Sequence, residues 1–293
     1  MGAETFLQTL IAGLVVGSVY GLVALGYVTI YRSSGVVNFA QGAFAMLGAL
    51  ITMYLISVRH LSYLSAALTA VVITTAVGVG VYVLVIARLR TEFVISQIMA
   101  TLGVSMLLEG IVLVLWGGYP QTLPPFTTND PFRLWGVSVA PQGVWVMLMA
   151  GVVLTGLYLV NNRTMFGKKM TAAATDPMAA SLVGISRGAM ISWSFLISAA
   201  IGATAGLFLA AMVPMNYASG SGFGLKGFVA AVLGGWGKSA GAVVGGLALG
   251  VVETFGASFL PAGYKDAVSF FLLLVILYYR PTGILGSSLV ESD

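Results

Sequence analysis

Charged residues, cysteine and histidine are all scarce in this chain. Only 8% of its 293 residues are charged, whereas 59% are hydrophobic. A soluble domain carries roughly 25% charged residues, so this chain cannot cover its surface with polar side chains. The composition therefore excludes an ordinary soluble protein.

The missing side chains also exclude most kinds of chemistry. The chain has no cysteine, which excludes disulfides, thiolate nucleophiles and cysteine-ligated metals. His60 is the only histidine, which excludes zinc sites built from paired histidines. We therefore predict no catalytic residue, no metal site and no cofactor in this chain. The net charge of +4 is explained first by membrane topology, and we expect no nucleic-acid partner.

Long apolar runs are abundant. Continuous runs of 18 or more apolar residues with few charges are typical of transmembrane helices. We predict an all-α, polytopic helical membrane protein with about eight or nine spans, forming one domain over residues 1–293. The expected spans are 6–31, 36–57, 62–86, 93–116, 143–160, 190–212, 240–259 and 264–280. A further apolar piece at 225–236 reaches only about 18 Å, which predicts a short or re-entrant helix.

The basic residues predict the orientation. If the 161–189 loop lies inside the cell and the short piece crosses, nine of the thirteen Lys and Arg residues lie inside. This positive-inside bias places the N-terminus outside and the C-terminus inside. If the short piece only re-enters, the last two spans reverse and the bias weakens.

Small residues recur at a spacing of four in two of the expected spans. Gly13, Gly17 and Gly21 form one such stripe, and a second runs through Gly246 and Gly250. Glycines at this spacing let helix backbones approach closely. The stripes predict tight packing between spans and say nothing about a substrate.

Polar residues interrupt the second apolar run. Asn38, Phe39 and Gln41 lie between Gly35 and Gly42. Broken helices with polar side chains near glycine often line transport sites. The alternative is an amide hydrogen bond that holds neighbouring helices together. The residues leave both interpretations open.

Two carboxylates, Glu109 and Glu253, lie deep in expected spans. Ionisable residues in a membrane are costly and usually face the interior or a water path. Glu253 could attract an ammonium-bearing solute or could serve as a hydrogen-bonded structural residue. The candidate substrate pathway therefore comprises Asn38, Phe39, Gln41 and Glu253.

The 161–189 loop contains a short helix with its own start and stop signals. Asp176 suits an N-cap, Pro177 suits the first turn and Gly184 can end the helix. Met178 and Leu182 are four residues apart and share an apolar face. This face can fill a groove on another protein, or the helix can lie on lipid headgroups. The candidate residues for contact with a partner are Asp176, Pro177, Met178, Ala179, Ala180, Ser181, Leu182, Val183 and Gly184.

Four stretches together resemble one family over nearly the whole chain. They are GSVYGLVALGYVTIYRSSGVVNFAQGAFAMLGA, AASLVGI, GLKGFVAAVLGGWGKSAGAVVGGLALGVVE and YKDAVSFFLLLVILYYRPTGILG. In this order they are similar to the LivH-type permease subunits of ATP-binding-cassette (ABC) importers for branched-chain amino acids, urea and other small solutes. The family usually has Asn-Phe-Ala-His-Gly where this chain has Gln41, which cannot titrate near neutral pH as histidine can.

The resemblance implies an ABC importer permease fold and a set of partners. These are a second, paralogous permease subunit, two cytoplasmic ATPase subunits that bind ATP and Mg²⁺, and a periplasmic or lipid-anchored solute-binding protein. It implies a bacterial or archaeal cytoplasmic (inner) membrane, and ATP hydrolysis in the partners, so that this chain is not an enzyme. Residues 176–183 correspond to the helix that couples ATPase closure to the spans. The alternative is an ion-coupled secondary transporter or channel that acts alone, which needs clustered carboxylates.

Overall fold

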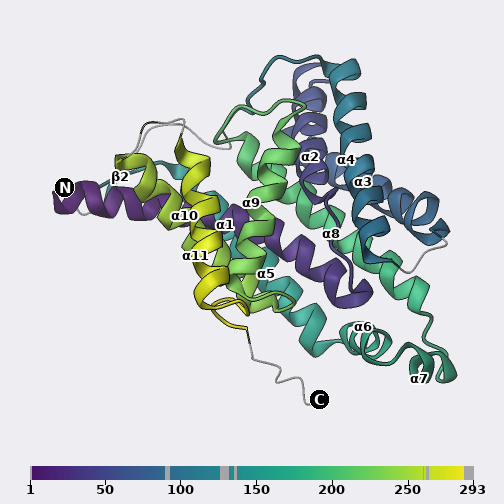
Figure 1. Cartoon of the computed structure of the whole chain (residues 1–293). Helices are drawn as coiled ribbons and strands as arrows, with labels where there is room; N and C mark the ends of the chain where they lie inside the picture. Colours follow the sequence, from purple (N-terminus) through teal and green to yellow (C-terminus); the bar gives the residue numbers. More distant parts are fainter. Residues whose placement is uncertain are drawn as a thin grey trace.

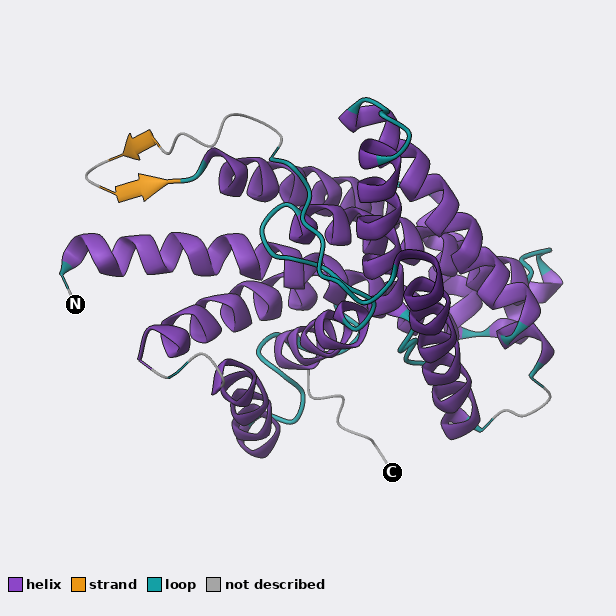
Figure 2. Ribbon diagram, turned by 90° about the horizontal axis from the view of Figure 1, so that it is seen from above, coloured by secondary structure: helices purple, strands orange, loops and turns teal. Residues whose placement is uncertain are grey.

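The computed structural model describes residues 2–89, 93–125, 132–134, 137–259, 261 and 264–286. Its helices are α1 (Ala3–Ser34), α2 (Gln41–Ser57), α3 (Tyr63–Leu84), the 3₁₀ turn η1 (Ile86–Arg88), α4 (Val94–Trp116), α5 (Pro141–Arg163), α6 (Met165–Thr175), α7 (Pro177–Leu182), α8 (Arg187–Ala210), α9 (Ser219–Gly234), α10 (Ser239–Phe259) and α11 (Lys265–Tyr279). Strands β1 (Phe132–Leu134) and β2 (Val137–Val139) form one small antiparallel pair beside the N-terminal part of α1 (Figures 1 and 2). The all-α prediction is therefore correct except for this pair.

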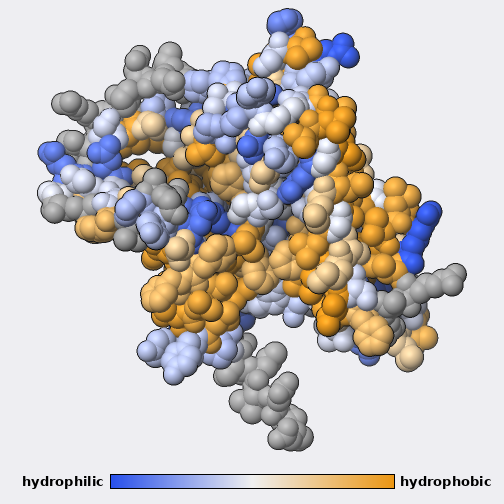
Figure 3. All heavy atoms as spheres, turned by 45° about the horizontal axis from the view of Figure 1, so that its top comes forward, coloured by the Kyte–Doolittle hydropathy of each residue, from blue (hydrophilic) through white to orange (hydrophobic). Residues whose placement is uncertain are grey.

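The surface and the helix lengths identify a multi-pass membrane protein. Six helices of the described chain are long and apolar enough to cross a membrane: α1, α3, α4, α5, α8 and α10. Large apolar side chains such as Leu64, Leu68 and Met106 are exposed on α3 and α4. Figure 3 shows hydrophobic side chains over much of one face. Soluble proteins rarely expose such large apolar patches, so this surface suits contact with lipid.

Helix α1 lies in the middle of the bundle and packs against α10, α8 and α9 (Figure 1). The predicted glycine stripes face each other where α1 meets α10. A Cβ atom added at Gly250 would lie 2.3 Å from the Gly17 backbone, and one at Gly13 would lie 2.7 Å from the Val251 Cα. A side chain at either position would force the helices apart, which confirms the predicted role in packing.

The chain between α1 and α2 is not helical, so the expected span 36–57 is wrong in its first five residues. Gly35 ends α1 with a φ of 74°, a conformation that glycine adopts without strain. The Asn38 side-chain oxygen then accepts a hydrogen bond from the Ala40 N–H (3.2 Å). This local turn competes with helix formation, and α2 begins only at Gln41.

The short helix predicted at 225–236 is present but begins earlier, because α9 starts at Ser219. Its first two turns are rich in glycine, which by itself disfavours helix. Close packing against α2 accounts for two of the glycines: a Cβ atom at Gly220 would lie 3.2 Å from the Ala43 Cα, and one at Gly224 would lie 3.1 Å from the Gly42 Cα. With 16 residues, α9 is about 24 Å long at 1.5 Å per residue, shorter than the hydrocarbon layer of about 30 Å.

Candidate functional site

Helix α7 has the caps that the sequence predicts. Asp176 Oδ1 accepts hydrogen bonds from the N–H groups of Met178 (3.0 Å) and Ala179 (2.9 Å). Pro177 is the first helical residue, where its missing N–H leaves no bond unmade. Gly184 follows the helix with a φ of 79°. The bounds Pro177–Leu182 lie within the predicted 176–183.

The apolar side chains of α7 are not covered by any of the residues that the structure describes. Met178 is 79% exposed, Leu182 84% and Val183 74%. Ala180 faces the protein and is buried. Figure 1 places α6 and α7 at one extremity of the molecule. The arrangement presents three apolar side chains on a short capped helix.

Helix α6 connects α7 to the rest of the bundle, in the 161–189 segment where the sequence predicts a loop before the short helix. Thr164 caps it by accepting a hydrogen bond from the Gly167 N–H (3.3 Å). Its buried residues recur every third position at Gly167, Met170 and Ala173, the signal that could have revealed the helix. Because α6 packs against α1, α5 and α8, a displacement of α7 would reach three of the long helices.

The break between α1 and α2 brings Asn38, Phe39 and Gln41 together. Gln41 is fully buried, and its side-chain nitrogen donates to the Ser198 carbonyl oxygen (3.1 Å). The Ser198 hydroxyl lies 2.5 Å from Gln41 Oε1 and 2.9 Å from the Gly26 carbonyl oxygen. These contacts join α1, α2 and α8, as the structural interpretation of the amide requires.

Asn38 is also fully buried, but its bonding is incomplete. Its Nδ2 atom has no hydrogen-bond partner among the described residues. The neighbouring Phe39 N–H donates to Thr101 Oγ1 (3.2 Å). The Phe39 ring packs against the Phe228 ring, with 5.4 Å between the ring centroids. Asn38 lines a cavity of about 680 Å³ between α1, α3, α4 and α8. Thr101, Gln97 and Arg187 line it too, and sequence analysis did not identify them.

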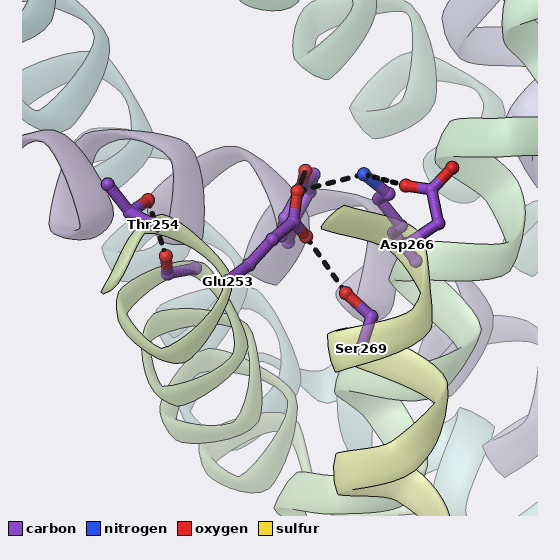
Figure 4. Close-up of polar contacts among 7 residues, drawn as sticks. Glu253, Thr254, Asp266 and Ser269 are labelled. Carbon is purple, nitrogen blue, oxygen red and sulfur yellow. Dashed lines mark hydrogen bonds and ion pairs between the residues drawn. The ribbon is translucent and has the colours of Figure 1, made fainter. Parts of the chain in front are cut away.

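Glu253 belongs to a separate network that joins α1, α9, α10 and α11. Its carboxylate is fully buried and accepts hydrogen bonds from Tyr20 Oη (3.1 Å), Lys226 Nζ (2.9 Å) and Ser269 Oγ (3.0 Å). Lys226 also pairs with Asp266 (2.9 Å). Figure 4 shows Glu253 pointing toward Ser269. The network supplies Glu253 with a positive partner, and a role for it in a solute pathway stays a prediction.

Comparison with known proteins agrees with this architecture. A family model described as "Branched-chain amino acid transport system / permease component" matches residues 9–277. The high-affinity branched-chain amino acid transport system permease protein BraD of Pseudomonas aeruginosa is 34% identical, over 98% of this chain and 97% of BraD. LivH of Salmonella typhimurium, described in the same words, is 32% identical over the same shares.

A solved structure shares the fold. PsaBC from Streptococcus pneumoniae in complex with Fab matches 94% of this chain and 92% of its own with a TM-score of 0.50. At 12% sequence identity this likeness concerns the fold alone. The family match and both relatives cover almost the entire chain. The chain therefore belongs to the LivH-type family of branched-chain amino acid transport permeases.

Proposed function

We propose that this chain is the membrane-spanning permease subunit of an ABC importer. It moves branched-chain amino acids, or a related small organic solute, into the cell. ATP and Mg²⁺ are bound and ATP is hydrolysed in separate subunits, and this chain is not an enzyme. One observation carries the proposal: α7 is a capped helix whose exposed apolar side chains are connected through α6 to three of the long helices.

In this proposal the apolar face of α7 fills a groove on a cytoplasmic ATPase subunit. An amphipathic helix in a groove is a common mode of recognition, in which a few apolar anchors supply most of the affinity. ATP-driven closure of the ATPases moves α7, and α6 transmits the movement to α1, α5 and α8. The permease then changes from a state open to the outside to a state open to the cytoplasm, because each state makes different contacts with the partner subunits.

The distribution of charge supports placing α6 and α7 on the cytoplasmic side. Arg32 at the end of α1 and Arg187 at the start of α8 line a shared cavity with Ala174 of α6. Lys168 and Lys169 are exposed on α6. Basic residues are enriched on the cytoplasmic side of membrane proteins. We place the protein in the cytoplasmic (inner) membrane of a bacterium or archaeon.

The proposal includes three kinds of partner. A second, paralogous permease subunit completes the pathway, two ATPases dock on the cytoplasmic side, and a periplasmic or lipid-anchored binding protein delivers the solute. The family membership and the permease relatives support this composition.

Reconstitution tests the proposal against a transporter that acts alone. The chain is placed in liposomes with its second permease subunit, the ATPases and the binding protein, and uptake of labelled leucine is measured. We expect uptake that needs ATP and all the subunits. Accumulation by this chain alone on an ion gradient would falsify the proposal and support a secondary transporter.

A further inference from the structure

The 680 Å³ cavity beside Asn38 combines three kinds of wall. Aliphatic and aromatic side chains form about half of it, among them Ile30, Val36, Ile86, Val94, Ile191 and Phe195. Asn38, Gln97 and Thr101 add amide and hydroxyl groups. Arg187 adds a positive charge, and no carboxylate is among the described residues that line the cavity. Small-molecule sites combine apolar walls with convergent polar groups, and this cavity has both, with a larger polar share than most.

Asn38 supplies a hydrogen-bond donor that the protein itself does not use. The residue is fully buried, its oxygen is taken by the Ala40 N–H, and its Nδ2 has no partner among the described residues. Buried polar groups are nearly always paired, so an orphaned donor beside a cavity indicates that something else brings the acceptor.

Arg187 is poorly explained by the structure of its own helix. It is the first residue of α8, where the positive end of the helix dipole disfavours a cation. It is exposed, and no carboxylate in the described parts of the chain forms an ion pair with it. Both the guanidinium and the helix terminus therefore attract an anion to the cavity.

We propose that this cavity holds the transported solute before its release to the cytoplasm, and that it recognises the solute by its carboxylate. This inference rests on the proposed function. Arg187 attracts the carboxylate, and Asn38 Nδ2 donates a hydrogen bond to one of its oxygens when the solute is seated. The apolar wall covers an aliphatic or aromatic side chain. The solute's ammonium group has no counter-charge among the described lining residues.

A phospholipid fits these observations less well than a small solute. An anionic headgroup could pair with Arg187, but an acyl chain in the cavity would lie against Asn38, Gln97 and Thr101. Polar groups in contact with hydrocarbon lose hydrogen bonds that nothing replaces. The buried amide donor therefore favours a ligand with its own acceptor oxygen.

The inference makes a specific statement about selectivity. A carboxylic acid that lacks the amino group should occupy the cavity about as well as the amino acid does. An amino alcohol that lacks the carboxylate should not occupy it. Leucine, 4-methylpentanoate and leucinol provide this series on one carbon skeleton.

The absence of cysteine from the chain gives a clean test. Ala87 lines the cavity and is exposed, so Ala87→Cys places one thiol at the cavity wall. The complete transporter is prepared in inside-out vesicles, and the rate at which a maleimide modifies this chain is followed by mass. A solute at about ten times its dissociation constant should slow the reaction about tenfold. We expect this from leucine and from 4-methylpentanoate, and no slowing from leucinol.

Further variants separate recognition of the carboxylate from simple steric blockage of the thiol. In the Ala87→Cys background, Arg187→Gln should abolish the protection, and Arg187→Lys should retain part of it. Arg163→Gln removes an exposed charge that lines no described cavity, and it should leave the protection unchanged. Equal protection by leucinol, protection only by short-chain phosphatidylglycerol, or no protection by any of the three solutes would each overturn the inference.

Uptake by cells that express the same Ala87→Cys transporter separates this inference from the proposed function. ATP-dependent uptake without protection would overturn the carboxylate site and leave the importer intact. Uptake that does not need the ATPases would overturn the importer, whatever the labelling shows.

Discussion

The network around Glu253 and the helix α7 differ in how far their side chains are buried and partnered within this chain. Glu253 is fully buried, and Tyr20, Lys226 and Ser269 all donate to it. On α7 the backbone is well capped, yet Met178 and Leu182 are almost completely exposed. The first region is complete within one chain. The second region has an apolar surface that no described part of the chain covers.

Exposure alone does not distinguish α7, because apolar side chains are also exposed on α3 and α4. Lipid can cover those long helices. Helix α7 has six residues and follows an amphipathic helix that carries the exposed Lys168 and Lys169. Lysines of this kind stay in water, so α7 is expected at or beyond the membrane surface, where a partner protein can cover it.

Breaking the buried region should give the largest loss of stability. Glu253→Ala leaves two hydroxyl groups without their acceptor and leaves Lys226 with only its exposed partner Asp266. Removing one partner of a buried ion pair costs about 3–5 kcal/mol, and because Asp266 remains we expect a loss at the lower end, about 3 kcal/mol. Chemical unfolding in detergent measures this change. Glu4→Ala, at an exposed position, serves as the control and should change stability by less than about 0.5 kcal/mol. Equal stability of the two variants would show that the network does not hold the helices.

The hydrogen bonds of Gln41 should contribute less than the ion pair. Gln41→Leu keeps a similar volume but removes both bonds to Ser198, and an unpaired buried group costs about 1–3 kcal/mol. The same unfolding assay measures the loss, with Gln8→Leu at an exposed site as the control. Unchanged stability together with an altered range of transported solutes would favour the pathway interpretation of Gln41.

Removing the N-cap of α7 should lower stability less, and only within this helix. Asp176→Ala removes the acceptor for two N–H groups, which destabilises the helix by about 1 kcal/mol. Hydrogen exchange at the Met178 and Ala179 amides should become about fivefold faster, since these groups lose their partner. Asp176→Asn keeps a side-chain oxygen and should exchange nearly as slowly as the natural chain. Fast exchange in both variants would mean that the cap does not depend on this oxygen.

Much of this architecture could be predicted from local sequence. Long apolar runs indicated α1, α3, α4, α5, α8 and α10, and the residues from Asp176 to Gly184 indicated a capped helix. The start of α2 could not be predicted by hydropathy, because the Asn38 side chain forms a turn that apolar composition does not reveal. The start of α9 was placed too late, because the fit of its glycines against α2 depends on the tertiary structure.

The candidate sites were harder to predict because their partners are distant in sequence. Gln41 bonds to a residue 157 positions away, and Lys226 is 27 positions from Glu253. No periodicity or motif indicates such pairs. Arg187 lies in the 161–189 loop, where the sequence gives it no role beyond the positive-inside bias, and only the folded chain places it beside the same cavity as Asn38.

The most direct measurement concerns Leu182, whose substitution should leave stability unchanged. Leu182→Asp puts a charge on an exposed side chain, so the permease should unfold as the natural chain does, but the charge cannot enter an apolar groove. Co-purification of the ATPase subunits and ATP-dependent uptake are measured together, with Thr175→Asp, at the exposed end of α6, as the matched control. We predict that Leu182→Asp loses both ATPase binding and uptake while Thr175→Asp retains them. Normal ATPase binding and uptake by a stable Leu182→Asp transporter would contradict the assignment of α7 as the contact with the ATPase.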